Sequence, residues 1–254
     1  MLGKNYNTYG EISLCNIKDD ISCAICIGGD KNSPSLTFKG DVKTANEDAV
    51  FAALHEDLAI LAVADSHFGH WASDTIMTYL AEHMHDMHNL ESFSNQPEDL
   101  FKIMFEQYSD DKEFSETTLI FVTININTGA GTGLSFGDSS AMIVNHLNHK
   151  RVNTKNHIYI SPNTAPDMFK SMANEFYFTL APGDAILLFT DGIDECHYGY
   201  PETSITDQHI HNLFLANNSG IQSFTSSLAS LALQGVNGNP GGQDNLAIAS
   251  MLFR

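Results

Sequence analysis

Leu58-Ala-Ile-Leu-Ala-Val-Ala-Asp65 is a run of seven apolar residues that ends in a carboxylate. A short run of this composition predicts a buried β-strand with the aspartate at its end. The same arrangement of a carboxylate at the end of an apolar run occurs three more times: Glu47 and Asp48 before 49–54, Asp191 after 185–190, and Asp244 before 245–253. The chain is therefore expected to place several acidic side chains at the ends of buried strands.

If these strand ends meet, several like charges share one small site. Two unit charges about 4 Å apart repel by roughly 4 kcal/mol at an effective dielectric near ~20. Such a cluster requires cations to compensate it. Because all the expected ligands are oxygen atoms, a hard divalent ion such as Mg²⁺ or Mn²⁺ suits the site.

Length and composition predict one domain over residues 1–254. The chain has 254 residues, of which 43% are hydrophobic, and no Pro/Ser-rich linker or charge block divides it. That length is sufficient for a substantial core. The formal net charge of −19 argues against affinity for nucleic acid or an anionic membrane, and it favours solubility. We expect a monomer.

The chain start and the cysteines point to the cytoplasm. The first residues lack the apolar stretch of a signal peptide, and no apolar segment of 18 residues is present to span a membrane. Four cysteines show no disulfide-scaffold density. Cys23 and Cys26 have CxxC spacing, but their apolar context favours a β-strand that carries two small hydrophobic side chains.

The order of the expected elements indicates an α+β fold. Strands are expected at 11–16, 21–27, 35–39, 49–54, 58–64, 117–125, 133–136, 140–145, 176–180, 185–190 and 245–253. Helical periodicity occurs at 71–87, from 97 onward, at 206–216 and at 220–234. Residues 146–174 are polar and are expected to form an irregular, mobile excursion. Sheets packed together with helices outside satisfy this order.

Two other motifs are rejected on their context. The glycine-rich residues 129–133 join two expected strands and open no helix, so they do not form a phosphate cradle. His83, His85 and His88 lie on one expected helix, whose geometry prevents all three imidazoles from converging on a metal. A solvated helix face is the simpler interpretation of these histidines.

Six segments together resemble the metal-dependent protein phosphatases, the type 2C serine/threonine phosphatases, in their bacterial form. In chain order they are Lys43-Thr-Ala-Asn-Glu-Asp-Ala49, Val63-Ala-Asp-Ser-His-Phe-Gly69, Glu116-Thr-Thr-Leu119, Phe136-Gly-Asp-Ser-Ser-Ala141, Leu187-Leu-Phe-Thr-Asp-Gly-Ile-Asp-Glu195 and Gly242-Gln-Asp-Asn245. Each segment alone is weak evidence, but their order over roughly residues 36–254 is specific.

The resemblance implies a four-layer αββα sandwich, in which two antiparallel sheets are flanked by helices, and a centre of two Mn or Mg ions. It implies that Asp65 bridges the ions, that Asp191 and Asp244 serve one ion, and that Glu47 or Asp48 and the Ser66 carbonyl serve the other. Asp138 is the candidate ligand for a third ion. His67 would protonate the leaving oxygen, and Lys43 would grip the phosphate of a phosphorylated protein substrate.

Three departures from the family motifs leave alternatives open. Lys43 stands where the family has Arg, and an ammonium does not bind phosphate bidentately. Ser66 and Phe68 stand where the family has Gly, which tolerates conformations that other residues avoid. A catalytically weak or inactive relative that acts as a binding module is therefore the second hypothesis. A metal-dependent nuclease fits the carboxylates but not the net charge.

Overall fold

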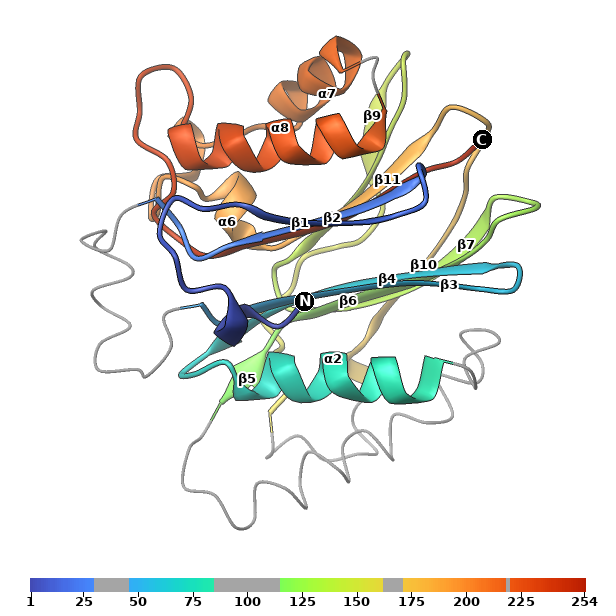
Figure 1. Cartoon of the computed structure of the whole chain (residues 1–254), viewed down its shortest axis with the longest axis horizontal. Coiled ribbons are helices and arrows are strands. Elements are labelled where there is room, and N and C mark those ends of the chain that lie inside the picture. The colour runs from blue at the N-terminus through green and yellow to red at the C-terminus, as the bar shows by residue number, and fades with distance from the viewer. Residues whose placement is uncertain (30–45, 85–114, 162–170, 218–219) are drawn as a thin grey trace.

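The apolar runs pair into two antiparallel sheets that pack face to face (Figure 1). The computed structural model describes residues 1–29, 46–84, 115–161, 171–217 and 220–254. The first sheet has the order β1 (Ser13–Ile17), β2 (Ile21–Cys26), β12 (Leu246–Leu252), β11 (Ala185–Phe189), β8 (Ser140–Val144) and β9 (His149–Arg151). The second has the order β10 (Asn174–Thr179), β7 (Ala130–Phe136), β6 (Leu119–Asn125), β4 (Leu58–His67) and β3 (Asp48–His55), with β5 (Glu116–Thr117) paired to the end of β4.

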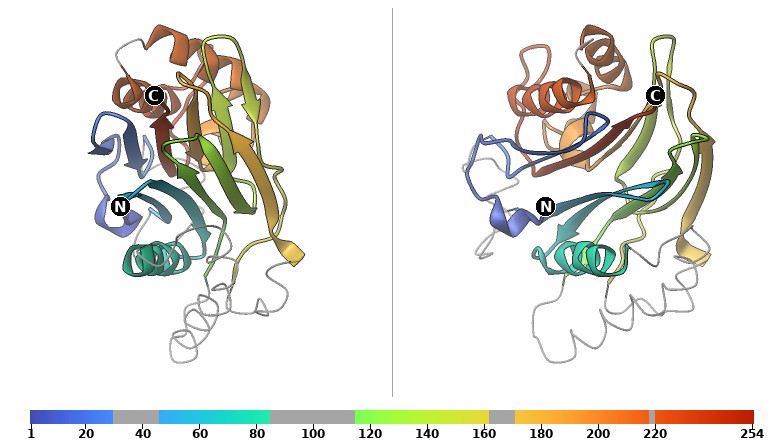
Figure 2. Two further views of the ribbon diagram at one scale, coloured as in Figure 1. Left: turned by 90° about the vertical axis from the view of Figure 1, so that its right-hand side faces the viewer. Right: turned by 45° about the vertical axis from the view of Figure 1, so that its right-hand side comes forward.

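Helices cover the outer faces of both sheets, so the expected four layers are present (Figure 2). Helix α2 (Trp71–His83) packs on the second sheet, and α7 (Asp207–Ala216) and α8 (Ile221–Gln234) pack on the first. The shorter helices are α6 (Asp191–Asp194) and the 3-10 turns η1 (Gly3–Asn5) and η3 (Pro201–Thr203). No helix among the described residues is long and apolar enough to cross a membrane.

Strand β4 shows why its sequence is continuously apolar. Leu61 and Val63 face the other sheet, whereas Ile60, Ala62 and Ala64 face α2. Both faces of the strand are therefore buried, and an alternating polar pattern would place polar groups in one of the two interfaces. Only the ends of such a strand can carry carboxylates that reach water or an ion.

Most expected elements lie within one or two residues of their observed bounds. The expected strand 133–136 is longer in the structure, because β7 begins at Ala130. The buried Cys23 and Cys26 lie in strand β2, as their apolar context predicted. The strand expected at 35–39, the helix expected from 97 and the end of the 71–87 helix lie outside the described residues.

The expectation of an irregular excursion over 146–174 was wrong for part of that segment. It contains strand β9, and Ile160 forms a two-way backbone bridge with Thr117. Much of the rest is held by asparagine side chains that bond backbone groups, a pattern without strand or helix periodicity. Residues 162–170 lie outside the described residues.

Two glycines of β7 make room for aromatic rings on the neighbouring strand. Phe176 lies opposite Gly133 and Phe178 lies opposite Gly131, and each ring occupies the space that a Cβ on its glycine would need. Phe176 is buried in the core between the sheets, whereas Phe178 is half-buried at its margin. The two sites therefore differ in how easily the ring can move aside.

Gly133→Ala is expected to lower the unfolding free energy by about 1–3 kcal/mol, because the buried Phe176 ring cannot move aside without disturbing the core. Gly131→Ala is the matched control and should cost less, because Phe178 can rotate toward solvent. Urea denaturation of both variants measures the difference. Equal losses at the two positions would contradict this account of the packing.

Candidate functional site

The site is built around two aspartates that face each other across neighbouring strands. Asp48 is the first residue of β3, and Asp65 lies opposite it on β4. Both are buried, with 1% and 4% of their surface exposed. Side chains at facing positions of an antiparallel pair have Cβ atoms roughly 4.5–5.5 Å apart, and like charges there are destabilising. Two carboxylates so placed favour a cation between or beside them.

Thr190 joins this pair to the other sheet. Its hydroxyl donates a hydrogen bond to Oδ2 of Asp48 over 2.7 Å and accepts one from the Ala247 N–H over 2.9 Å. Thr190 directly precedes Asp191, the first residue of α6. The hydrogen bond therefore brings the start of α6 to the end of β3, although 142 residues separate Asp48 from Thr190.

Asp244 and Asp191 are brought together by a close backbone approach. A Cβ on Gly192 would overlap the carbonyl oxygen of Asn245, so α6 packs directly against the backbone next to Asp244. The Asn245 amide also accepts a hydrogen bond from the Glu47 N–H over 2.9 Å and donates one to the Ile27 carbonyl over 2.8 Å. Asn245 thus links the two sheets at the same end as Asp48.

Glu47 and Ser66 lie where the second sheet meets the start of α2. The Glu47 carbonyl accepts a hydrogen bond from the Ser73 hydroxyl over 2.6 Å, and its Oε1 accepts one from the Gly69 N–H. The Ser66 hydroxyl accepts the Ser73 N–H over 2.8 Å. Ser66 is a strand residue opposite Thr117, so this position does not require the conformational freedom of glycine.

Phe68 adopts a backbone conformation that favours glycine. Its φ is 66°, in the left-handed region, where a bulky residue is strained. The side chain is 67% exposed, and its ring lies edge-on to His67 with centroids 6.3 Å apart. Phe68 therefore combines a backbone conformation typical of glycine with an exposed aromatic ring beside His67.

Asp138 is held by a segment that sequence analysis treated as irregular. Its Oδ2 accepts a hydrogen bond from the Tyr159 hydroxyl over 3.2 Å, and its Oδ1 is buried without a hydrogen-bond partner among the described residues. Asn156 bonds the backbone N–H of Gly137, and Asn153 bonds the carbonyl of Ser139. The segment from Asn153 to Tyr159 therefore supports the loop that presents Asp138.

Two raised pKa values show that the carboxylates share one neighbourhood. Burial raises the pKa of the Tyr159 phenol, and the charges of Asp138, Asp65 and Asp191 raise it further. Burial also raises the pKa of Glu195, with further increases from Asp194, Asp138 and Asp244 and an opposing effect of Lys155. Asp138 thus acts on both groups, and it shares Tyr159 with Asp65 and Asp191 and Glu195 with Asp244.

His67 lies at the margin of this neighbourhood. Its side chain is 33% exposed, and its Nδ1 lies 3.5 Å from Oε1 of Glu116. Its ring packs edge-on against Tyr159, with centroids 4.8 Å apart. The imidazole is therefore oriented by an aromatic ring and a carboxylate while part of it faces solvent.

The donor set fits a hard divalent ion held partly through water. All the carboxylates and the Ser66 carbonyl offer oxygen, and Asp138 contributes a buried oxygen without a hydrogen-bond partner among the described residues. No three His, Cys, Asp or Glu side chains in the described part of the chain are grouped closely enough to hold one ion. Mg²⁺ is commonly bound through one or two carboxylates and several waters, which this pairwise placement suits.

Some predicted residues cannot be placed, and some important ones were not predicted. Lys43, His85 and His88 lie outside the described residues. His83 lies on α2, where its ring stacks on Tyr79. Tyr159 was not predicted, because no motif or periodicity marks it. The role of Thr190 was not predicted either, although its position directly before Asp191 was a usable signal.

Comparison with known proteins gives a likeness in structure. No family model matches the chain, and no curated protein matches its sequence. The catalytic domain of the serine/threonine phosphatase PstP, solved with two manganese ions, has a TM-score of 0.67 at 16% identity, covering 95% of this chain and 99% of that one.

Two further solved structures extend this likeness. The phosphatase MsPP from Mycobacterium smegmatis, solved with cacodylate, has a TM-score of 0.64 at 18% identity, covering 92% of this chain and 98% of that one. RsbX, solved with magnesium, has a TM-score of 0.61 at 15% identity, covering 95% of this chain and 100% of that one. At these identities the likeness shows that the fold is shared.

Gly192→Ala is expected to lower the unfolding free energy by about 1–3 kcal/mol and to weaken Mn²⁺ binding, because the added methyl pushes α6 away from Asn245. Gly29→Ala is the matched control, since a Cβ there meets no atom closer than 3.6 Å. Urea denaturation and calorimetric Mn²⁺ titration measure both effects. Unchanged stability of the Gly192 variant would show that α6 does not depend on this contact.

Proposed function

We propose that this chain is a metal-dependent protein phosphatase of the type 2C family that hydrolyses phosphoserine and phosphothreonine in proteins. The observation that carries the proposal is the facing pair Asp48 and Asp65. The pair lies at the end of a fold that the chain shares with solved serine/threonine phosphatases.

The proposed centre holds two Mn or Mg ions. Asp65 would contact both, Asp191 and Asp244 would serve one, and Glu47 or Asp48 with the Ser66 carbonyl would serve the other. Asp65, Asp191 and Asp244 are not grouped closely enough in the described structure to hold one ion, so metal binding would have to draw these carboxylates together. The buried Oδ1 of Asp138 makes it the candidate ligand for a third ion. When bound, such ions would acidify a water and stabilise negative charge on the phosphoryl group.

His67 is proposed as the proton donor to the departing serine or threonine oxygen. Its partial exposure allows contact with substrate, and Glu116 and Tyr159 hold its ring. A group within reach of the leaving oxygen can donate a proton as the P–O bond breaks. Lys43 is proposed, from the sequence alone, to bind the substrate phosphate as a point charge.

The charge of the chain favours phosphorylated proteins over nucleic acid as substrates. A net charge of −19 repels a polyanion such as nucleic acid. A single phosphorylated side chain is repelled much less, because its charge lies within the site. We further propose that the protein works as a single-domain monomer in the cytoplasm.

The second candidate is a binding module without turnover. The strained Phe68 favours this candidate, because it places an exposed aromatic ring beside His67, the proposed proton donor. A module of this kind would retain the metal and bind phosphoproteins while failing to hydrolyse them. Activity measurements on the wild-type protein separate the two candidates.

Asp65→Asn is expected to abolish Mn²⁺-dependent hydrolysis of phosphopeptides and p-nitrophenyl phosphate while it preserves or raises the stability of the metal-free protein. The change removes a proposed ligand and also removes repulsion with Asp48. Asp57→Asn is the matched control, because Asp57 is exposed in the turn at the opposite end of the same hairpin. Steady-state kinetics and thermal denaturation in EDTA give both readouts.

Wild-type turnover by the Asp65 variant at saturating Mn²⁺ would overturn the proposed centre. Metal binding by the wild-type protein without hydrolysis of any phosphopeptide would favour the binding module instead. Loss of stability in the metal-free variant would contradict the argument from like charges.

His67→Ala is expected to slow hydrolysis of a phosphoserine peptide by about 10²-fold or more and that of p-nitrophenyl phosphate much less, because only the serine oxygen needs a proton to leave. His83→Ala is the control, since this histidine packs on Tyr79 at the end of α2. Parallel kcat measurements on both substrates test the difference. Equal losses on the two substrates would indicate that His67 has a structural role.

A further inference from the structure

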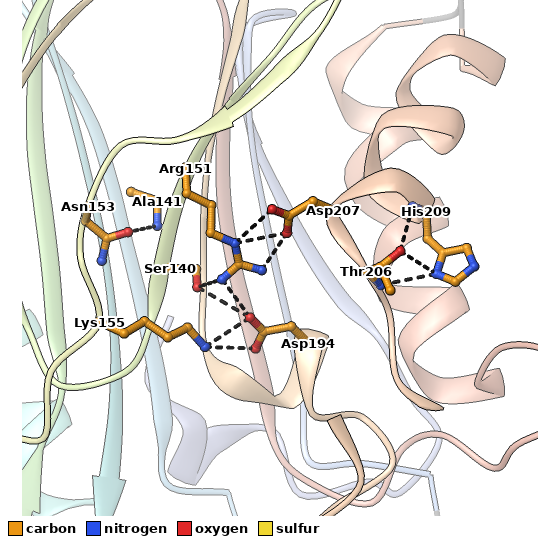
Figure 3. A network of polar contacts seen from close by, with 9 residues as sticks. All are labelled: Ser140, Ala141, Arg151, Asn153, Lys155, Asp194, Thr206, Asp207 and His209. Atoms are coloured by element: carbon orange, nitrogen blue, oxygen red, sulfur yellow. Dashed lines mark hydrogen bonds and ion pairs between the residues drawn. The ribbon is translucent and has the colours of Figure 1, made fainter. Parts of the chain in front are cut away.

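Arg151, the last residue of β9, binds two carboxylates and a hydroxyl at once (Figure 3). Its Nε lies 2.9 Å and its Nη2 lies 2.6 Å from Oδ1 of Asp207. Its Nη1 lies 2.8 Å from Oδ2 of Asp194 and also donates to the Ser140 hydroxyl. The planar guanidinium is therefore fixed in orientation by partners on two of its edges.

These partners lie on three separate elements. Asp207 is the first residue of α7, Asp194 is the last residue of α6, and Ser140 is the first residue of β8. Arg151 itself pairs with Met142 of β8, and its guanidinium lies 5.5 Å from the centre of the Phe189 ring. One side chain thus connects the two helices to the edge of the first sheet.

Helix α6 depends on outside contacts for its orientation. It has four residues, so it contains about one turn and little internal hydrogen bonding. Gly192 holds one side of it against Asn245, and Asp194 holds the other side against Arg151 and Lys155. The Asp194 side chain is only 11% exposed, which limits competition from water. Asp191 begins the same turn.

Arg151 stays charged although it is partly buried. It lies on the strand next to β8 and donates a hydrogen bond to the Ser140 hydroxyl. Burial acts to lower the pKa of Arg151, but hydrogen bonds and charges from Asp207 and Asp194 raise it, so the group stays charged.

We propose that Arg151 is a positioning residue that fixes α6 and thereby aims the Asp191 carboxylate at the metal centre. This inference rests on the proposed function, because it assigns Asp191 to that centre. Arg151 contacts neither the substrate nor an ion in this scheme. Its effect passes through Asp194 and the single turn that joins Asp194 to Asp191.

The direction in which metal affinity changes when Arg151 is removed distinguishes a positioning role from a purely electrostatic effect. A guanidinium near a metal centre repels the ion, so by charge alone its removal should tighten metal binding. If Arg151 instead aims a ligand, its removal should weaken binding. Loss of a residue that orients a metal ligand commonly costs about 10–100-fold in affinity.

Calorimetric Mn²⁺ titration of the full chain tests the inference without an activity assay. Arg151→Met is expected to raise the Mn²⁺ Kd about tenfold or more. Arg151→Lys keeps the positive charge but loses the planar set of N–H donors of the guanidinium. Its Mn²⁺ Kd should lie between those of wild type and Arg151→Met. Arg254→Met is the matched control, because Arg254 forms an ion pair with Asp20 and is 60% exposed. Its Kd should stay within about twofold of wild type.

The outcomes distinguish this inference from the proposed function. If the wild-type protein binds no Mn²⁺, the proposed centre and this inference both fail. If wild type binds and Arg151→Met binds equally or more tightly, only the positioning role fails. Circular dichroism verifies that each variant is folded. Arg151→Met is expected to fold, because Lys155 still forms an ion pair with Asp194 when Arg151 is removed. If Arg151→Met does not fold, Arg151→Lys decides alone, and wild-type affinity in it would overturn the inference.

Discussion

The structure at this end of the molecule depends on two buried carboxylates that face each other at the end of a hairpin. Asp48 and Asp65 are at paired positions with almost no exposed surface, so water cannot screen them effectively. Around them the two sheets are joined by the hydrogen bond that Thr190 donates to Asp48 and by the one that Asn245 accepts from the Glu47 N–H. These bonds fix the separation of the sheets at the point where negative charge is concentrated, and a cation is the simplest way to compensate that charge.

The loops near this end are held by side chains in place of backbone ladders. Asn153 and Asn156 bond the backbone around Asp138, and Arg151 ties α6 to α7. A loop that presents a carboxylate cannot also be a paired strand, so its polar backbone groups need other partners. Amide side chains supply these partners, whereas the Arg151 guanidinium binds other side chains. Both can rigidify a site without extending the sheet.

The sequence predicted the sheets more fully than it predicted this support. Apolar runs such as 58–64 are explicit signals, because both faces of β4 are buried and every residue must be apolar. Asp65 and Asp191 could be predicted as site residues because they end such runs. Tyr159 and Arg151 were not found, because their partners are distant in sequence and an isolated polar residue carries no period. The left-handed conformation of Phe68 could not be predicted either, because it is a property of the backbone angles and leaves no pattern in the sequence.

The position of β12 has a consequence for the order in which the fold forms. This strand lies between β2 and β11 in the middle of its sheet, yet it follows every other described strand in the chain. While a ribosome is still making it, β2 and β11 have no neighbour on their inner edges, and unpaired edges invite wrong partners. Pairing with β2 also closes a loop of more than two hundred residues, from Cys26 to Leu246, and long-range pairing slows folding. The nascent chain therefore depends on β12 to close the first sheet and to bring Asn245 to Glu47.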